Sequence, residues 1–391
     1  MDEQLRDLLR LTLAEGVGPV LLGRLLAALG SPSAVLHASP AQLERIKGVG
    51  AVRSRAIAAA AAGAGSLVDR EIEEIDRHGV QLVAFGSDSY PQPLSQIPDP
   101  PPLLYVRGRL DPGGQDRYCV AIVGSRGCTQ YGLEQAGRFG AGLADAGLTV
   151  VSGGARGIDT AAHRGALTVH GRTIAVLGCG LSHVYPPENA GLFDRIAAED
   201  RGAVVSELPM TTPPKAENFP ARNRIISGLS LGVLVIEAGR QSGSLITARV
   251  AGEDHGREVM ALPGRVDSPS SMGSNDLIRL DGAAMVTQPA DVLDVLHPAG
   301  RRHHHGAEVS LWKSAEPSGA PAETADEHEE PGLSERQRRV LDAVGTTGDS
   351  ATIEHLIDRT GLAVHELRAE LTVLELRRSI RRAGSRFERT R

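Results

Sequence analysis

The chain has 391 residues, 41% of them hydrophobic, and a formal net charge of −6, which accommodates two to four folding units with a sizeable core. It has no apolar run of about 18 residues and no basic-then-apolar start, which argues against a membrane span or a signal peptide and favours a cytoplasmic protein. Its three cysteines, Cys119, Cys128 and Cys179, do not have the spacing of a disulfide framework or a zinc site.

Residues 1–70 are rich in leucine and alanine and predict a helical domain with two similar glycine turns. Gly16-Val17-Gly18 forms the first turn and Gly48-Val49-Gly50 forms the second. Two glycines at this spacing let backbone amides approach a phosphate, as in a helix-hairpin-helix element. Glycines also serve simply to reverse the chain in a small helical bundle. The sequence leaves both interpretations open.

Prolines punctuate the next segment, residues 71–112. They occur in Tyr90-Pro-Gln-Pro and again in the run from Ile97 to Tyr105. Because proline lacks an amide donor and restricts the preceding residue, regular structure is disfavoured there. We expect an extended connector.

Residues 113–297 alternate short apolar strands with helical stretches. Continuous apolar strands separated by helices predict an α/β domain with a Rossmann-like, doubly wound and mostly parallel sheet covered on both faces. Helical stretches are predicted at 131–146 and 158–169. The predicted strands are residues 119–123, 148–151, 173–177, 203–205, 231–236 and 258–262.

Residues 298–332 are acidic, rich in proline and serine, and poor in apolar residues, which predicts a disordered linker. The run His303-His304-His305 lies within it. Three consecutive histidines cannot all face one ion, so a solvated linker is favoured over a metal site.

Residues 333–391 predict a winged helix, with helices at 335–344, 353–360 and 364–376 followed by a hairpin. From Thr372 to the end of the chain there are seven arginines and two glutamates. This positive wing fits a grip on DNA phosphates. A solvated face or a protein-docking surface fits it equally well.

Small polar residues follow several of the predicted strands. Gly124-Ser125-Arg126 follows the first of these strands and Ser152-Gly153-Gly154 follows the second. In an open parallel sheet the ligand crevice lies beyond the carboxyl ends of the strands. Glycines there admit an anion close to the backbone, and an arginine adds a permanent charge. The pattern predicts a phosphate-lined crevice.

Two later runs add a stacking ring to this crevice. Phe219 stands beside Arg222, Asn223 and Arg224, and the run 239–248 places Ser242, Gly243, Ser244 and Thr247 where a strand ends and a helix begins. An aromatic platform beside anion donors is what single-stranded nucleic acid requires.

Signals for catalysis are weak by comparison. The chain contains neither Gly-x-Gly-x-x-Gly at the first helix nor Gly-x-x-x-x-Gly-Lys-Ser/Thr. Glu237 ends a strand, where it has the chemistry to act on a small molecule or to accept hydrogen bonds from loop amides. We expect no catalysis, no cofactor and no metal.

The ordered set of motifs resembles the DNA-processing protein A family, also called DprA or Smf. The matching runs are Ile122–Arg126, Ser152–Asp159, Phe219–Ile226 and Ser242–Ala248, followed by Gly273-Ser-Asn-Asp-Leu-Ile. The resemblance spans roughly residues 80–290. It implies an N-terminal domain like a sterile alpha motif and, in many members, a C-terminal winged helix.

The resemblance further implies a protein without catalytic turnover that binds incoming single-stranded DNA. Such a protein shields the DNA from nucleases and loads the RecA recombinase during natural transformation, as a homodimer joined through the Rossmann-like domain. A rival interpretation is a nucleotide-binding sensor or nucleotide hydrolase, because related folds bind nucleotides at the same strand ends. A third is a duplex-binding regulator acting through the winged helix.

By motif position, Arg126 is expected to pair with a phosphate and Phe219 to stack on a base. Lys215, Arg222 and Arg224 are expected to line the path of the strand, and Asn223 to brace its loop. The full set of candidate DNA-binding residues comprises Gly124, Ser125, Arg126, Ser152, Gly153, Gly154, Lys215, Phe219, Arg222, Asn223, Arg224, Ser242, Gly243, Ser244, Thr247, Gly273, Ser274 and Asn275.

Overall fold

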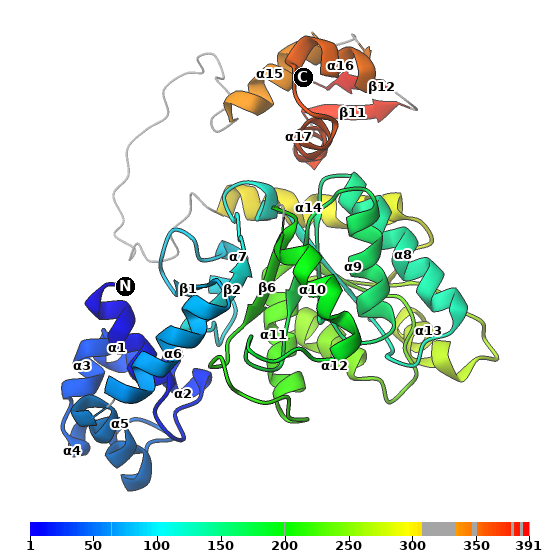
Figure 1. Cartoon of the computed structure of the whole chain (residues 1–391). Coiled ribbons are helices and arrows are strands. Elements are labelled where there is room, and N and C mark those ends of the chain that lie inside the picture. Colours follow the sequence, from blue (N-terminus) through cyan, green and yellow to red (C-terminus); the bar gives the residue numbers. More distant parts are fainter. Residues whose placement is uncertain are drawn as a thin grey trace, which may run out of the picture. The chain divides into compact units, whose positions relative to one another are not determined.

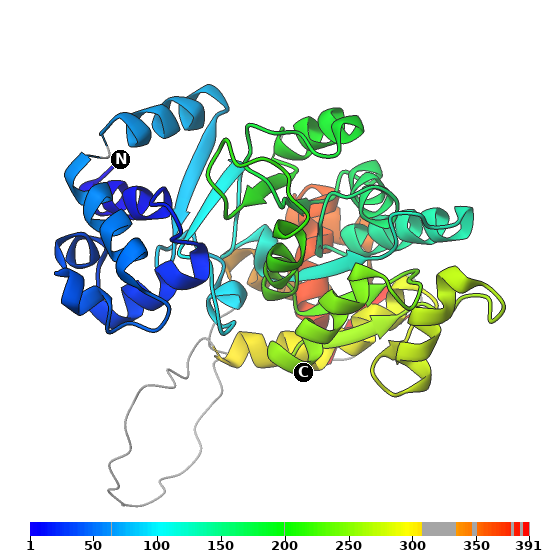
Figure 2. The ribbon, with the colours of Figure 1, turned by 90° about the horizontal axis from the view of Figure 1, so that it is seen from below.

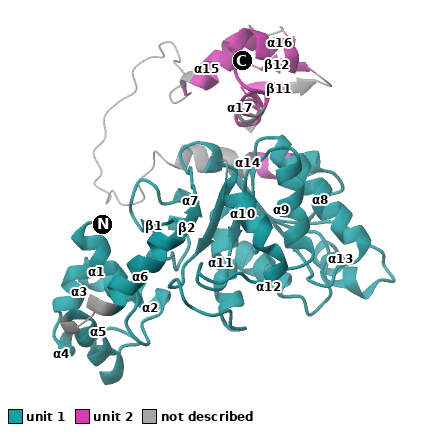
Figure 3. Cartoon of the chain, viewed as in Figure 1, with its two compact units in different colours: residues 1–292 teal, residues 293–391 magenta. Residues whose placement is uncertain are grey.

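A computed structural model describes residues 1–63, 65–198, 200–306, 334–345, 350–376, 379–383 and 386–390. The chain forms two compact units, residues 1–292 and 293–391, which Figure 3 distinguishes by colour.

The first unit begins with a helical segment, as predicted. Its helices are α1 (Glu3–Thr12), α2 (Pro19–Leu29), α3 (Pro32–His37), α4 (Pro40–Leu43), α5 (Ala51–Gly63) and α6 (Gly65–Arg77). Asp2 caps α1 by accepting a hydrogen bond from the Leu5 amide at 2.8 Å, and proline occupies the first position of α2, where no amide donor is required.

The two glycine turns of this segment are joined by a single side chain. Gly16 and Gly48 have φ angles of +73° and +98°, a region that favours glycine. The Arg53 guanidinium donates to the Gly16 carbonyl at 3.0 Å and to the Gly48 carbonyl at 2.6 Å. One arginine thus ties the two turns together.

A nine-stranded sheet forms the centre of the unit (Figure 1). Its strand order is β1-β2-β6-β5-β4-β3-β7-β8-β9. Every neighbouring pair from β6 to β9 is parallel, whereas β2 pairs antiparallel with both β1 and β6. The strands are β1 (Val80–Ala84), β2 (Leu103–Gly108), β3 (Cys119–Val123), β4 (Thr149–Ser152), β5 (Thr173–Val176), β6 (Gly202–Ser206), β7 (Gly232–Val235), β8 (Glu258–Ala261) and β9 (Ala284–Met285).

The mostly parallel α/β fold and its six predicted strands are confirmed. The prediction of an extended connector over residues 71–112 is wrong. Residues 80–84 and 103–108 pair with each other and extend the sheet at β6. The prolines lie between these strands, around the single turn of α7 (Gln92–Ser95), where they remove no ladder hydrogen bond. The segment that was expected to link two domains is therefore built into the central sheet.

Helices cover both faces of the sheet. Ile174 and Val176 of β5 belong to a core cluster that includes residues of α11 and α12, whereas the intervening Ala175 belongs to a cluster with α9 and α10. This alternation is the period-2 pattern of a strand. The helices are α8 (Gln130–Asp145), α9 (Ile158–Thr168), α10 (Ala190–Ala197), α11 (Asn218–Leu229), α12 (Gly243–Arg249) and α13 (Met272–Arg279), with short turns at Gln115–Arg117, Pro187–Asn189, Val250–Asp254 and Pro269–Ser271.

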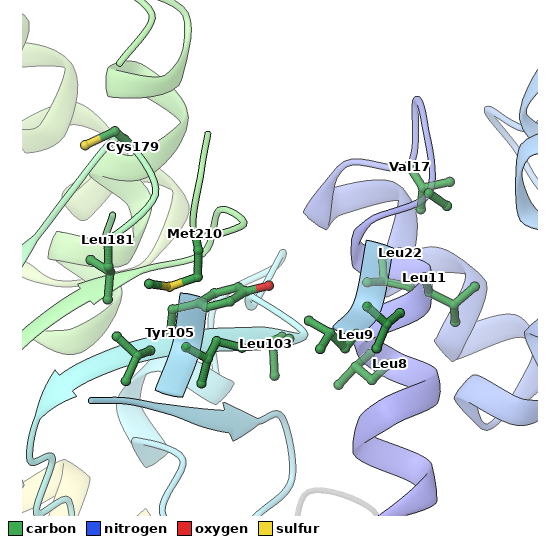
Figure 4. Packing of buried hydrophobic residues seen from close by; sticks show 14 of the residues in the cluster. Leu8, Leu9, Leu11, Val17, Leu22, Leu103, Tyr105, Cys179, Leu181 and Met210 are labelled. Atoms are coloured by element: carbon green, nitrogen blue, oxygen red, sulfur yellow. The ribbon is translucent and has the colours of Figure 1, made fainter. Parts of the chain in front are cut away.

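The helical segment shares one hydrophobic core with the sheet. Leu9 and Leu22 of the helices belong to the same cluster as Leu103 and Tyr105 of β2 and Met210, which follows β6. Figure 4 shows these side chains at close range, and Figure 2 shows the N-terminal helices lying beside β1 and β2. The N-terminal helices and the sheet therefore bury a continuous apolar interface.

His163 is a buried titratable group in α9. Its Nδ1 lies 2.6 Å from Thr173 Oγ1, and the Thr173 hydroxyl donates to the Val150 carbonyl at 2.6 Å. Nδ1 therefore carries the imidazole proton, and Nε2 has no hydrogen-bond partner among the described residues. Burial, reinforced by the charge of Arg222, lowers the pKa of His163 to about 3.

This histidine predicts an acid-sensitive fold. In the unfolded chain the His163 imidazole titrates near pH 6.5. The contribution of the neutral histidine to stability is therefore complete above that pH and is lost as the pH falls toward the pKa of the folded state. At pH 5 the loss amounts to about 2 kcal/mol. Urea unfolding at pH 7.5 and pH 5.0 should show this loss in the wild type but not in His163→Gln, whose other titrating groups are the same. An identical pH dependence in both proteins would contradict the assignment.

The second unit contains the predicted winged helix. Its elements are α15 (Glu335–Val344), β10 (Ser350–Thr352), α16 (Ile353–Thr360), α17 (Val364–Leu376), β11 (Ile380–Ala383) and β12 (Arg386–Arg389). The three strands pair in the order β10-β12-β11, and Leu356, Leu367 and Phe387 lie in their common core. Arg377 and Arg378 of the predicted basic wing, and the side chain of Arg382, lie outside the described residues.

The boundary between sheet and linker differs from expectation. Helix α14 (Pro289–Gly306) continues past residue 298, so the three histidines lie in a helix rather than in an extended linker; their side chains, and residues 307–333, lie outside the described residues. Across the described parts of the chain, no helix combines the length and apolarity needed to cross a membrane.

Candidate nucleic-acid interface

A pocket of about 750 Å³ opens at the carboxyl ends of the parallel strands. Its walls come from the loops after β3, β4, β5, β6 and β7 and from the first residues of α11 and α12. The strand order reverses between β3 and β7, and ligands of doubly wound folds bind at such a switch point. The volume falls within the range of small-molecule sites and accommodates a nucleotide.

Glycines allow the loops around the pocket to approach closely. A Cβ on Gly124 would lie 2.5 Å from the Ile158 side chain and 2.9 Å from the Glu237 carbonyl, so any larger residue would separate the loop after β3 from α9 and β7. Gly157 has a φ of +77°, and a Cβ there would lie 2.5 Å from the Ser125 carbonyl. The glycines predicted to admit a phosphate thus serve first to pack the loops of the pocket together.

Phe219 lines the pocket together with two arginines, Arg126 and Arg222. The Arg126 guanidinium lies 5.0 Å from the centre of the Phe219 ring, and that of Arg222 lies 6.0 Å from it. Tyr185 contacts the same ring, with 5.6 Å between centroids and 46° between planes. Arg126 is exposed and Phe219 half-buried, so both charge and ring are accessible to a ligand.

Arg222 forms the floor of the pocket rather than a mobile arm. It is only 4% exposed, and its guanidinium donates to the carbonyls of Gly153, at 2.7 Å, and Val176. Burial lowers the pKa of Arg222 to about 10, so the group still carries its charge at neutral pH. This fixed positive charge lies beneath Phe219.

Asp159 is the buried acidic counterpart of Arg222. Its carboxylate accepts a hydrogen bond from the Ala155 amide at 3.3 Å. Burial raises the pKa of Asp159, and the charge of Arg222 opposes this rise. The pair gives the floor of the pocket mixed polarity, with the positive guanidinium 6.0 Å from the centre of the Phe219 ring.

Hydroxyl groups of the loop after β7 and of α12 also line the pocket. Ser242 caps α12, and its Oγ lies 2.7 Å from Ser244 Oγ. Thr247 lies one turn further along the same wall. The backbone amides of Ser125 and Ser242 donate to the carbonyls of Glu237 and Gly239, at 2.8 and 2.9 Å. The donors at these two positions are therefore side-chain hydroxyls.

Ten of the eighteen candidate residues line this pocket. They are Gly124, Ser125, Arg126, Phe219, Arg222, Asn223, Ser242, Gly243, Ser244 and Thr247. The run Ser152-Gly153-Gly154 lies beneath the pocket, where the Ser152 hydroxyl donates to the Ile122 carbonyl at 2.6 Å and the Gly154 carbonyl accepts from Asn189 at 3.0 Å. These three residues connect strand β4 to the loops above it.

The run Gly273-Ser274-Asn275 braces neighbouring loops and does not line the pocket. The Gly273 amide donates to the Ala238 carbonyl at 2.7 Å, and the Ser274 hydroxyl donates to the Ser271 carbonyl at 3.1 Å. The Asn275 amide group exchanges two hydrogen bonds with the Gly264 backbone, at 3.0 and 3.1 Å. The structure therefore gives these residues contacts with protein backbone.

Arg224 departs from its expected place on the path of the strand. It is 8% exposed and forms a buried ion pair with Glu207 and a second ion pair, at 3.2 Å, with the partly exposed Asp99. Burial raises the pKa of Glu207 to about 7. Arg224 therefore joins α11 to the loop after β6 and lies outside the pocket lining. Lys215 is exposed and adjoins the lining residues Pro214 and Ala216 without lining the pocket itself.

Glu237 accepts hydrogen bonds from a neighbouring loop, which is the simpler of the two roles considered for it. It is 1% exposed, and its carboxylate accepts hydrogen bonds from the Thr129 amide at 2.9 Å and from the Thr129 hydroxyl at 3.1 Å. A carboxylate at this position stabilises the N-terminus of α8. The residue thus anchors a helix.

Among the lining residues with polar or aromatic side chains, sequence reasoning missed three: Tyr185, Asp159 and Gln241. Tyr185 lies nine residues beyond the end of β5, in a loop that returns to the strand ends. The chain has only five tyrosines, and an aromatic residue in a loop after a parallel strand was the available signal. Asp159 lies in the run Ser152–Asp159 and Gln241 lies in the run 239–248, but neither residue was assigned to the site.

Each of the three segments of the chain matches a known protein family or domain. A model described as DNA recombination-mediator protein A matches residues 81–297, more than half of the chain. A model of the DprA winged helix domain matches residues 320–385, and a model of a SAM-like helix-hairpin-helix tandem matches residues 6–62.

Individual proteins give the same picture. Protein Smf of Escherichia coli is 47% identical over 225 residues, and the match spans 58% of this chain and 58% of that protein. The X-ray structure of DNA processing protein A from Streptococcus pneumoniae has a TM-score of 0.64 at 34% identity, covering 75% of this chain and 98% of that chain. A structure of the Helicobacter pylori protein, described by its single-stranded DNA binding mode, covers 55% of this chain and 95% of its own, with a TM-score of 0.49 and 31% identity.

Proposed function

Because this chain belongs to the DNA-processing protein A family, we propose that it binds single-stranded DNA in the pocket between β3 and β7. In this proposal one base stacks on Phe219 and the adjoining phosphate meets Arg126. The winged helix and helix-hairpin-helix segments fit a protein that handles DNA.

One observation carries the proposal: an accessible ring flanked by two guanidinium groups inside a pocket of nucleotide size. Base stacking on an aromatic side chain contributes about 1–3 kcal/mol and tolerates any base, because every base has a π-face. The exposed Arg126 adds a charge-assisted contact to phosphate. Together these contacts favour single strands, whose bases are free to leave their neighbours.

The rival function, a nucleotide sensor or hydrolase, has less support. The buried carboxylates beside the pocket are engaged, since Asp159 accepts from the Ala155 amide beside Arg222 and Glu237 caps α8. A general base must reach the proton that it abstracts. Glu237 does not line the pocket, and the Asp159 carboxylate at its floor already accepts a hydrogen bond from the Ala155 amide. The site is better suited to holding a strand than to cleaving one.

Further parts of the proposal rest on the family. Membership of a family of DNA recombination mediators supports delivery of the bound strand to a RecA recombinase. Protection of that strand from nucleases and a place in natural transformation are further parts of the proposal. A homodimer and a cytoplasmic location belong to the same proposal. Purified RecA, strand and protein in one DNA strand-exchange assay would test the delivery step.

Paired titrations test the core of the proposal. At one fixed salt concentration we expect oligo-dT to bind more tightly than duplex DNA of equal length, and mononucleotides to bind far more weakly than either. Tight mononucleotide binding that competes with oligo-dT would favour the sensor instead. Preference for duplex would move the site to the winged helix.

Arg126→Ala should weaken binding to all sequences alike, because a phosphate contact is lost. The slope of log affinity against log salt should flatten by about 0.7, the value for one phosphate neutralised on a single strand. Arg126→Lys keeps the charge and should retain most of that slope. An unchanged slope in Arg126→Ala would remove this residue from the phosphate contact.

A further inference from the structure

We propose that helix α6 of the N-terminal segment positions the two loops that carry the aromatic pair of the DNA pocket, through the carboxylates of Glu71 and Glu74. The inference rests on the proposed function of the pocket. It assigns to the N-terminal segment a role in single-strand binding although none of the described residues of that segment lines the pocket.

Glu71 holds the loop that follows β6. It is 5% exposed, and its Oε1 accepts a hydrogen bond from the Met210 amide at 2.7 Å. The Met210 side chain is fully buried beside Tyr105 in the core shared by helices and sheet (Figure 4). A buried amide without a partner is costly, so the Met210 backbone is fixed where Glu71 stands.

Glu74, one turn further along α6, holds the loop that follows β5. Its Oε2 accepts a hydrogen bond from the Ser182 hydroxyl at 2.9 Å. Glu74 also forms an ion pair with Arg77 of the same helix, and its Oε2 lies 3.5 Å from Nε2 of His78. One face of α6 therefore contacts both loops through two residues separated by a helical turn.

The two loops are also bonded to each other. The Ser182 amide donates to the Met210 carbonyl at 3.0 Å, and the Gly180 amide donates to the Thr212 carbonyl at 2.9 Å. His183 Nε2 lies 3.0 Å from the Thr211 carbonyl. The loops after β5 and β6 thus form one hydrogen-bonded layer, and α6 contacts that layer at Met210 and Ser182.

This layer leads directly into the pocket. Three residues after Ser182 the first loop supplies Tyr185. Four residues after Met210 the second loop supplies Pro214, and it then enters α11, whose second residue is Phe219. The two rings lie in contact. A shift of either loop would therefore change the orientation of the stacking platform.

The sign of the expected effect separates positioning from charge. Removing an acidic side chain near a DNA site would, by electrostatics alone, strengthen binding. If Glu71 positions the loops, Glu71→Ala should weaken binding instead. Glu71→Gln loses the charge but keeps an oxygen that accepts from the Met210 amide, so its affinity should stay at or slightly above that of the wild type.

The experiment compares full-length wild type, Glu71→Ala, Glu71→Gln and the matched control Glu73→Ala, an exposed glutamate of the same helix. The probe is oligo-dT containing 2-aminopurine, whose fluorescence is quenched by stacking. We expect Glu71→Ala to bind roughly fivefold more weakly with an unchanged salt slope, and to quench less at saturation. Glu73→Ala and Glu71→Gln should quench like the wild type.

Amide hydrogen exchange of residues 178–185 and 207–217 gives a readout that needs no DNA. We expect faster exchange there in Glu71→Ala than in Glu73→Ala. Equal exchange and equal quenching in these two variants would overturn the inference. A loss of oligo-dT affinity and quenching in Glu71→Gln as large as that in Glu71→Ala would also overturn it. If Glu71→Ala does not fold, Ser182→Ala, which removes only the contact to Glu74, takes its place and must give faster exchange in residues 178–185.

Failure of the proposed function looks different. In that case the wild type itself does not bind oligo-dT, while the exchange comparison still decides whether α6 positions the loops.

Discussion

Phe219→Ala is expected to weaken binding of oligo-dT by about 1–3 kcal/mol while leaving the salt slope near that of the wild type. The ring is the stacking surface of the proposed site, and its loss removes no cation, so no additional counterion is released or retained. Affinity measured by fluorescence anisotropy at four or more salt concentrations gives both quantities from one data set.

A matched control is available on the same unit. Phe85 is 51% exposed and makes an edge contact with Tyr90, with 5.4 Å between ring centroids, outside the pocket lining. Phe85→Ala should bind oligo-dT like the wild type. If Phe219→Ala also binds like the wild type while remaining folded, the pocket is not the DNA site.

Arg224→Met is expected to destabilise the first unit by about 3 kcal/mol or more. The substitution leaves Glu207, which is 5% exposed, without the guanidinium that offsets its burial, and it also removes the ion pair with Asp99. The measurement is the free energy of unfolding in urea at pH 7.5, with folded protein also titrated with oligo-dT. Because Arg224 does not line the pocket, the folded variant should retain affinity.

The double variant Arg224→Met/Glu207→Leu tests the cause. Replacing both partners of a buried pair by apolar groups removes the uncompensated charge, so much of the lost stability should return. Exposed ion pairs offer a control, since Arg265→Met, which breaks the contact with Asp267, should change stability by less than about 1 kcal/mol. If folded Arg224→Met loses as much affinity for oligo-dT as Arg126→Ala does, Arg224 contacts the bound strand after all.

Much of the fold was predictable because its signals are local. Six continuous apolar strands separated by helices gave the parallel sheet, and each was found within a residue or two of its predicted bounds. The prediction of an extended connector over residues 71–112 was wrong because the prolines were taken to disfavour regular structure throughout that segment. They cluster between β1 and β2, and each of these short strands pairs with a strand that is distant in sequence or across a long loop.

The binding site was predictable in outline for a geometric reason. The carboxyl ends of parallel strands meet at one edge of the sheet, so the polar residues after β3 and β7 had to converge there. Side-chain direction was not predictable in the same way. Arg222 and Arg224 are two residues apart in α11, about 200° around the helix, and only the packing of that helix decided which one faces the pocket.

The sequence by itself therefore determined the order of strands and helices, the family and the loops that form the pocket, since hydrophobic period and motif spacing are properties of neighbouring residues. Tertiary structure alone decided the contacts between distant residues. Glu71 reaches Met210 across 139 residues, and Glu74 reaches Ser182 across 108. Such contacts depend on how the N-terminal helices pack against the sheet, and no pattern within either segment specifies that packing.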